Sequence, residues 1–363
     1  MSRIRWYAAA LFIAALTALW ASRGIHDDKE ALKYIGCAQD LLHGDARDLL
    51  GSYKGYAGYV LFLLPFIALG TPWFAVVAQA ILALFAAFAL ARLVERVSGS
   101  ERCGTITLVI ALFCYPFQEW VLALYTESFF ASIAVLFVER VTKPGPVPWQ
   151  AVALAVVLLF ARPIGVLFVL PALIWRMRWP FEVPSAWRPV AYAAVLVLVL
   201  LAPGVARHQL GVIVEGHVIC GFPERSGASD RFHGTTILEA QIALFREPGY
   251  AAGLFIRRSL SLFTLTRPYF SKGHNLLLMP LYGLFVLALW GWWRWRAHPV
   301  IDLLMAIFLL NTALIGFSYD EWNGRFLVPL WPIIFIWAAL GSDRVGWHSQ
   351  RLIGRRSKEP AGP

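Results

Sequence analysis

The stretch WYAAALFIAALTALWA, residues 6–21, decides the fold class of this chain, because it is long, apolar and free of charged side chains. Similar runs recur along the 363 residues, of which 59% are hydrophobic and 15% are charged. Soluble globular proteins carry about 25% charged residues, and a bilayer crossing needs about 20 apolar residues. We therefore predict an all-α polytopic integral membrane protein. No clear small-residue cleavage site follows the first run, which favours a retained helix over a cleaved signal peptide.

Apolar segments indicate about ten transmembrane helices. The expected crossings are residues 6–22, 72–91, 103–117, 125–139, 148–161, 163–176, 187–205, 274–293, 299–317 and 325–341. The run GYVLFLLPFIALG, residues 58–70, contains Pro65 and would cover only about 20 Å as a helix, less than a hydrocarbon core of about 30 Å. We expect it to form a re-entrant or interfacial helix. The stretch FREPGYAAGLFIRRSLSLF, residues 245–263, is expected to lie as a helix on the outer membrane surface.

The distribution of basic residues indicates the orientation of these crossings. With Arg3 and Arg5 in the cytoplasm, the ten crossings place four further basic clusters on the same side, at residues 92–102, 140–143, 176–188 and 294–296. Basic residues in short loops favour the cytoplasmic side. We therefore expect a protein of the cell inner (plasma) membrane with both termini cytoplasmic. The formal net charge of +10 follows from this topology, and no nucleic-acid partner is expected.

This topology also divides the chain. Residues 1–341 are expected to form a single transmembrane domain, followed by a basic cytoplasmic tail at 342–363. Two long segments, 23–71 and 206–273, then lie on the extracytoplasmic side. Neither is long enough to fold as a separate soluble domain.

The first extracytoplasmic segment opens with HDDKEALKYIGCAQDLLHGD, residues 26–45, which holds three acids close together at Asp27, Asp28 and Glu30. Apolar residues recur at helical spacing after them, so one Asp can be a helix N-cap that stabilises the helix by about 1 kcal/mol. Three neighbouring carboxylates repel one another unless a cation, a proton or a substrate compensates. The alternative interpretation is therefore a general base or a metal-assisted site.

Several short motifs occur in one order along the chain. They are DDK (27–29) or DKE (28–30), the helix pattern of Tyr34, Ala38, Leu41 and Gly44, YTESFFASIAVLF (125–137), FARPIGVLFVLPAL (160–173) and GRFLVPLWPIIFIWAAL (324–340). With these motifs the chain resembles the GT-C glycosyltransferases, polytopic enzymes that use lipid-phosphate-linked sugars. The resemblance implies a GT-C-like fold with an acidic motif in its first extracytoplasmic loop. Many bacterial members place the acid four residues before the Tyr, where this chain has Glu30, so the choice among the three acids stays open.

The resemblance and the chemistry of sugar transfer together assign roles to the candidate residues. Asp28 is the expected general base, followed by Asp27 and Glu30. Arg162 and Arg325 are expected to bind the donor phosphate, because an Arg–phosphate contact is charge-assisted and often bidentate. Glu127, Tyr34 and Asp320 are expected to support these residues. Asp27 and Asp28 can also hold a divalent cation such as Mg²⁺ or Mn²⁺, which the paired carboxylates permit and do not require.

Each assignment has a structural alternative. Arg162 can reach the headgroups or pair with a nearby acid, Arg325 can pair with Asp320 or Glu321, and Glu127 can serve the start of a helix. These alternatives involve no substrate.

The function expected from the sequence is inverting transfer of a monosaccharide, hexosyl- or mannosyltransferase-like, from a polyprenyl-phosphate donor to an acceptor on the extracytoplasmic face. The expected partners are this donor, a lipid, glycan or protein acceptor, and membrane lipids. The alternatives are a transporter or flippase of a lipid-linked saccharide, a non-catalytic membrane assembly protein, and a glycan polymerase or ligase with a diphosphate-linked donor. A transporter predicts ionisable residues near the bilayer midplane and related halves.

Overall fold

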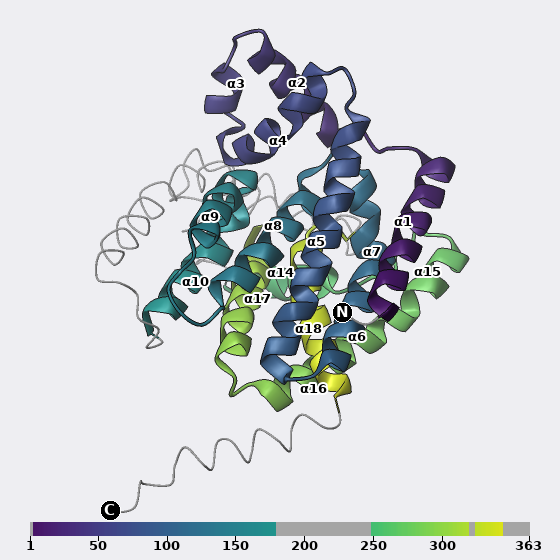
Figure 1. Ribbon diagram of the computed structural model, residues 1–363, viewed down its shortest axis with the longest axis vertical. Coiled ribbons are helices and arrows are strands. Elements are labelled where there is room, and N and C mark those ends of the chain that lie inside the picture. Colours follow the sequence, from purple (N-terminus) through teal and green to yellow (C-terminus); the bar gives the residue numbers. More distant parts are fainter. Residues whose placement is uncertain (1–2, 179–247, 319–323, 344–363) are drawn as a thin grey trace, which may run out of the picture.

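The computed structural model describes residues 3–178, 248–318 and 324–343 (Figure 1). Every regular element in these ranges is helical, and one isolated β-bridge joins His26 to Ala123. The all-α prediction is thus confirmed for the described residues. The predicted span 187–205, Asp320 and most of the predicted tail lie outside them.

The helices follow one another in this order. The N-terminal half contains α1 (Arg3–Arg23), α2 (Glu30–Leu42), α3 (Arg47–Leu50), η1 (Lys54–Tyr56), α4 (Ala57–Ala68), α5 (Trp73–Ser98), α6 (Glu101–Phe113), α7 (Tyr115–Gln118), η2 (Glu119–Leu122) and α8 (Thr126–Val141). Then come α9 (Trp149–Ala161), η3 (Pro163–Gly165), α10 (Val166–Arg178), α14 (Pro248–Leu262), α15 (Lys272–Leu278), η4 (Met279–Leu281), α16 (Tyr282–Trp295), α17 (Pro299–Ser318), η5 (Val328–Leu330) and α18 (Trp331–Ser342).

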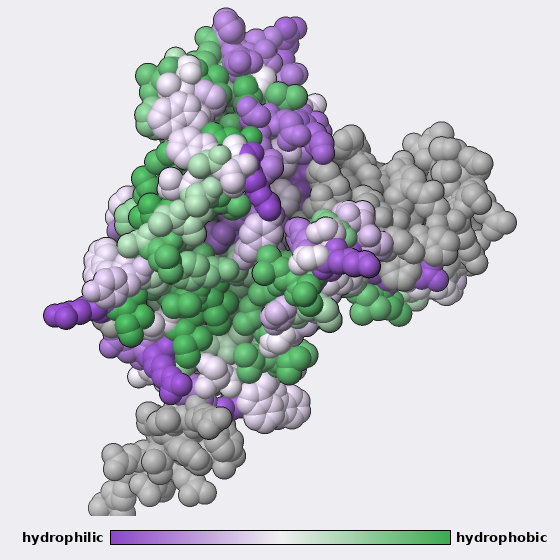
Figure 2. All heavy atoms as spheres, turned by 90° about the vertical axis from the view of Figure 1, so that its right-hand side faces the viewer, coloured by the Kyte–Doolittle hydropathy of each residue, from purple (hydrophilic) through white to green (hydrophobic). Residues whose placement is uncertain are grey.

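Four helical segments of the described ranges are long and apolar enough to cross a membrane. They are α1, α5, the continuous α15–α16 segment (Lys272–Trp295) and most of α17 (Pro299–Gly316). A fifth is formed by α6 with α7 and η2 if this pair, bent by 63°, counts as one span. Figure 2 shows hydrophobic residues gathered across the middle of one face, between hydrophilic residues above and below. Length and composition thus fit a membrane protein, with four or five of the ten expected crossings.

The other expected crossings within the described residues are shorter or more polar. The α9 helix (Trp149–Ala161) has 13 residues and ends because Arg162 precedes Pro163, which disfavours helical backbone at Arg162. Arg162 is extended, with φ −157° and ψ 148°. The Pro163–Met177 and Val328–Ser342 helices are similarly short, while α8 carries Glu127 at one end and Glu139 near the other. The count of ten stays a prediction.

The α5 helix runs through the middle of the bundle and packs against α6 and α8 (Figure 1). At its N-terminal end α2, α3 and α4 form a separate layer, which we call the cap. The run at 58–70 forms α4, which packs against α2 and α9 as part of this cap.

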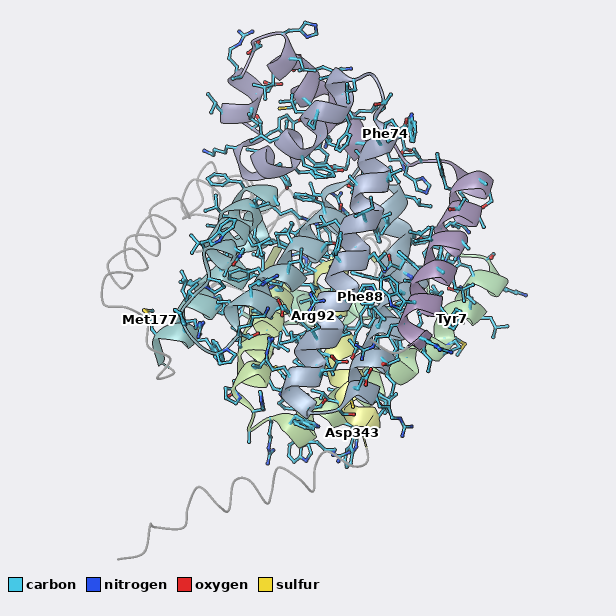
Figure 3. The ribbon with its side chains drawn as sticks, viewed as in Figure 1. Tyr7, Phe74, Phe88, Arg92, Met177 and Asp343 are labelled. Carbon is cyan, nitrogen blue, oxygen red and sulfur yellow. The ribbon has the colours of Figure 1, made fainter. Side chains whose placement is uncertain are left out.

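The opposite side of the bundle holds both described ends of the chain. There Arg5 of α1 pairs with Glu95 near the end of α5, and Arg294 donates to the Asp343 carbonyl at 2.6 Å. Figure 3 shows Phe74 next to the cap and Asp343 at the far side. The starts of α1 and α5 therefore lie at opposite sides, with α1 leading toward the cap.

Two further packing features differ from a simple array of crossings. The α14 helix, which was expected on the membrane surface, packs against α17, and Arg258 is buried rather than extended toward headgroups. The α16 and α18 helices approach closely at Gly291 and Gly341. A Cβ atom at Gly291 would lie 1.8 Å from the Trp337 carbonyl oxygen, so only glycine permits this approach.

Candidate functional site

The loop between α1 and α2 is held against a distant segment by backbone hydrogen bonds. Gly24, with a φ of 74°, lets the chain turn away from α1. The His26 amide then donates to the Leu122 carbonyl at 3.0 Å, and the Leu124 amide donates to the His26 carbonyl at 2.9 Å. This bridge fixes the start of the acidic motif beside the segment that leads into α8.

Asp28 points to that same segment. The hydroxyl of Tyr125 donates to Asp28, with the side-chain Oδ1 and the backbone oxygen each 3.3 Å away. The predicted N-cap role of Asp27 or Asp28 is wrong, because Lys29 occupies the N-cap position of α2 and no side chain caps it. Tyr125 holds the carboxylate of Asp28 instead. Asp27 is exposed.

The central feature of the site is a buried carboxylate between two arginines. Glu127 lies in the first turn of α8 and is fully buried. Its Oε1 atom lies 3.1 Å from Nη1 of Arg162 and accepts a hydrogen bond from Nε of Arg325. The alternative that Arg162 pairs with a nearby acid is thus confirmed, whereas the alternative partners of Arg325, Asp320 and Glu321, lie outside the described residues. We call Glu127, Arg162 and Arg325 the buried triad.

The buried triad connects to the cap through Arg325. Its Nη2 atom lies 3.7 Å from Oε2 of Glu30, and its guanidinium carbon lies 5.6 Å from the centre of the Tyr125 ring. The side chains of Glu127, Arg162, Arg325 and Glu30 are 0%, 6%, 9% and 27% exposed. The network therefore runs from the protein interior toward the surface at Glu30.

Local backbone features place each member of this network. Arg162 has an extended backbone and connects α9 to η3. Arg325 follows Gly324, whose φ is 78°. Glu127 follows the extended backbone at Tyr125. The four segments are far apart in sequence, and the cap end of the bundle brings them together.

Within the buried triad, Arg162 has a buried nitrogen without a well-aligned acceptor. Two guanidinium groups share the single carboxylate of Glu127. Nη1 of Arg162 is buried and makes no hydrogen bond of good geometry, although it is close to Glu127. A buried donor without an acceptor costs free energy, so Nη1 of Arg162 is a candidate position for an anionic ligand. A phosphate group fits guanidinium donors well.

Tyr34 belongs to an aromatic cluster within the cap. Its ring lies 6.4, 5.5 and 5.4 Å from the rings of Tyr53, Tyr56 and Tyr59, between centroids. Burial raises the pKa of Tyr34 far above its usual value, so its hydroxyl stays protonated. Sequence reasoning singled out Tyr34 and missed the other three, although their spacing of three residues is a recognisable signal.

Sequence reasoning also missed two residues that are linked to this cluster, Gln79 and Tyr125. The Tyr59 hydroxyl donates to Oε1 of Gln79 at 3.0 Å, and Nε2 of Gln79 donates to the carbonyls of Val121 and Ala123. Gln79 thus supports the segment that carries Tyr125. A lone glutamine in the apolar α5 was the signal for it, whereas no local signal distinguished Tyr125.

Lys33 of α2 pairs with Glu30, one turn earlier on the same helix. Its Nζ atom lies 2.9 Å from Oε1 of Glu30, and this hydrogen bond raises the pKa of Lys33. Glu30 thus lies between Lys33 and Arg325. Within the described ranges, no group of three or more His, Cys, Asp or Glu side chains is placed to hold a metal ion.

Comparison of the chain with models of protein families, with curated proteins and with solved structures found no match.

Proposed function

We propose that the chain is a membrane glycosyltransferase. It moves a monosaccharide from a polyprenyl-phosphate donor to an acceptor hydroxyl, with inversion, on the extracytoplasmic face of the plasma membrane. One observation supports the proposal: Glu30 contacts Arg325 of the buried triad, and Asp28 is held beside it by Tyr125, at one end of the bundle. Both chain termini are cytoplasmic in this proposal, and the cap faces outward.

Each group has a chemical task in this reaction. The Asp28 carboxylate takes the proton of the acceptor hydroxyl while its oxygen bonds to the anomeric carbon, a step that general base catalysis accelerates by about 10²–10⁴. The bond between that carbon and the phosphate oxygen breaks, and the leaving phosphate gains negative charge. Arg162 and Arg325 stabilise that charge, because fixed cations in a water-poor site cost no reorganisation.

Tyr125 and Glu30 are positioning residues in this scheme. Tyr125 holds the Asp28 side chain by its hydrogen bond and also contacts the guanidinium of Arg325. Glu30 fixes the outer edge of Arg325. Asp27 and Asp28 suffice for a divalent cation only together with a substrate phosphate, since Mg²⁺ is usually bound by one or two carboxylates plus phosphates. Transfer that persists in EDTA would remove the cation from the proposal.

A transfer assay with the purified protein and a panel of polyprenyl-phosphate sugars tests the proposal. Asp28→Asn is expected to lower kcat by about 100-fold or more. The matched control is Asp40→Asn, because Asp40 is an exposed acid of α2, the helix that follows Asp28, and this substitution should leave the rate unchanged. Arg162→Lys keeps the charge and is expected to raise KM for the donor, since it loses the planar donor geometry.

Three results would contradict the proposal at different levels. Full activity of folded Asp28→Asn would reassign the base to Asp27 or Glu30, and the same substitution at those positions would decide between them. Absence of transfer from every donor would reject the enzyme. Movement of a labelled lipid-linked sugar across vesicles without transfer would instead support the flippase.

A further inference from the structure

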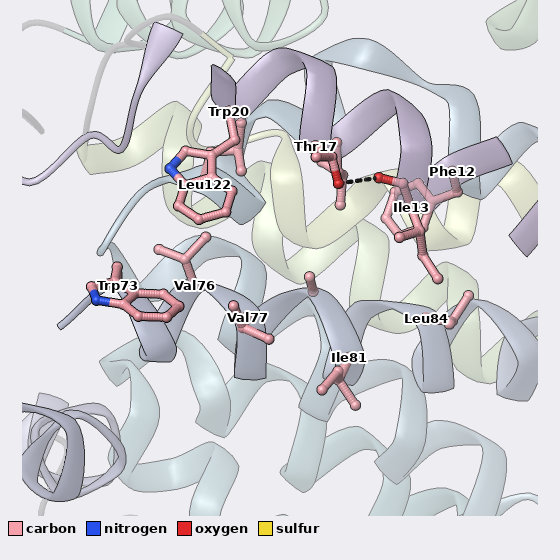
Figure 4. A pocket seen from close by; sticks show the side chains of 12 residues that line it. Phe12, Ile13, Thr17, Trp20, Trp73, Val76, Val77, Ile81, Leu84 and Leu122 are labelled. Carbon is pink, nitrogen blue, oxygen red and sulfur yellow. Dashed lines mark hydrogen bonds between the residues drawn. The ribbon is translucent and has the colours of Figure 1, made fainter. Parts of the chain in front are cut away.

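An apolar groove of about 220 Å³ lies between α1 and α5 (Figure 4), and no residue of the buried triad lines it. Trp20 and Trp73 lie at one end of it, and Ala80 and Ile81 line it further along α5. The hydroxyl of Thr17 also lines the groove but donates to the Ile13 carbonyl at 2.9 Å, so it requires no polar ligand. The lining therefore suits a hydrocarbon chain.

The groove opens sideways on two helices that are long enough to cross the membrane. Ile13, Ile81 and Trp20 are 55%, 52% and 40% exposed, so its open side faces the hydrocarbon of a bilayer. Its volume is below the range of about 300–1,000 Å³ typical of pockets for drug-sized ligands. It therefore accommodates one segment of a lipid chain whose remainder stays in the bilayer.

One end of the groove meets the acidic loop. The rings of Trp20 and Trp73 stack there, 6.2 Å apart, and Leu122 lines the groove. The carbonyl of Leu122 accepts the His26 amide at 3.0 Å, which joins this end directly to the loop that carries Asp28. Tyr125, three residues after Leu122, contacts Asp28 and Arg325. The segment from Leu122 to Tyr125 thus links the groove, which Leu122 lines, to the buried triad, where Tyr125 contacts Arg325 and also holds Asp28.

A cation lies at the same end. Arg23 follows Trp20 by three residues on α1, which places both on adjoining turns of one helix face. It is exposed and donates to the Tyr115 hydroxyl at 2.6 Å, which holds its guanidinium in place. Arg23 does not line the groove itself, but an apolar groove with a guanidinium about one helical turn beyond its Trp20 end is complementary to a lipid with an anionic head.

We propose that the groove binds the acceptor, and that the acceptor is a lipid whose head carries both a phosphate and a hydroxyl. Its chain lies between α1 and α5, its phosphate meets Arg23, and its hydroxyl reaches Asp28, which takes the proton. The donor phosphate lies at Arg162 and Arg325. This inference rests on the proposed transfer and names its acceptor class. In the bilayer the groove selects the chain by packing, because lipid tails are as apolar as the groove itself.

Photolabelling of the purified protein in nanodiscs tests the site without any sugar transfer. The probe is phosphatidylglycerol with a photoreactive acyl chain, which supplies a phosphate and free hydroxyls, and labelled peptides are mapped by mass spectrometry. We expect labels on α1 and α5, displaced by unlabelled phosphatidylglycerol at least about fivefold better than by phosphatidylcholine with the same chains. Arg23→Gln is expected to remove this preference.

Filling the groove supplies the second readout. Ala80→Phe is expected to lower the labelling by at least about fivefold. The control is Ala15→Phe, which adds the same ring at an exposed position on the other side of α1. Equal displacement by both lipids, or unchanged labelling of Ala80→Phe, would show ordinary bilayer lipid in the groove and overturn the inference. If the labelling behaves as expected while no donor gives transfer, the lipid site stands and the proposed enzyme falls.

Discussion

Removal of the negative charge at Glu127 is the sharpest test of the buried triad. Glu127→Gln keeps the size of the side chain but replaces a carboxylate oxygen with an amide group that donates hydrogen bonds. Arg162 and Arg325 then both lose their contacts with the Glu127 carboxylate, which lie at 3.1 Å for Arg162 and run through Nε of Arg325. Loss of one partner from a buried ion pair costs about 3–5 kcal/mol.

The measurement is thermal unfolding in detergent, followed by the loss of helical signal. At about 2 °C per kcal/mol, the value for the larger single domains, the midpoint should fall by about 6–10 °C. The matched control is Glu101→Gln, whose carboxylate lies 3.9 Å from Arg5 and is 65% exposed. An exposed pair contributes about 0–1 kcal/mol, so this midpoint should change by about 2 °C at most.

A double substitution separates charge from packing. Glu127→Gln with Arg162→Met leaves Arg325, which keeps Glu30 at 3.7 Å. The double variant should therefore lose less stability than the two single losses combined, with a coupling of about 0.5–3 kcal/mol. If Glu127→Gln unfolds like Glu101→Gln, or if the two losses simply add, the Glu127 carboxylate is hydrated and does not stabilise the two arginines.

Two further predictions concern packing and topology. Gly291→Ala should destabilise the protein by about 1–3 kcal/mol, because the added Cβ would meet the Trp337 carbonyl and disturb the α16–α18 contact. The control Gly283→Ala, on the same helix, places a Cβ with nothing within 4 Å and should be neutral or stabilising by up to about 1 kcal/mol. Equal unfolding midpoints for the two variants would contradict the close approach of the helices. A cysteine at Ser52 in the cap should react with a membrane-impermeant maleimide in intact cells and one at Ser98 should not, and the reverse pattern would invert the proposed orientation.

The sequence by itself determined the class of the molecule and the residues worth testing. Length and composition of the apolar runs predict membrane-crossing helices, since a bilayer demands about 20 apolar residues in a row. The same reading located Glu30, Glu127, Arg162 and Arg325, because ionisable residues at the ends of apolar runs are costly without a partner. Helical spacing also predicted α2 from Tyr34 and its neighbours.

Only the tertiary structure decided which of these residues meet. Arg325 and Glu127 are 198 positions apart, so no local pattern could show that one carboxylate serves both arginines. The N-cap role expected near Asp28 was wrong for the same reason: Tyr125, held close by the bridge at His26, offers a better partner than the helix end. Local sequence sets helices and hydrophobic faces, while the pairing of buried charges depends on which helix ends the packed bundle brings together.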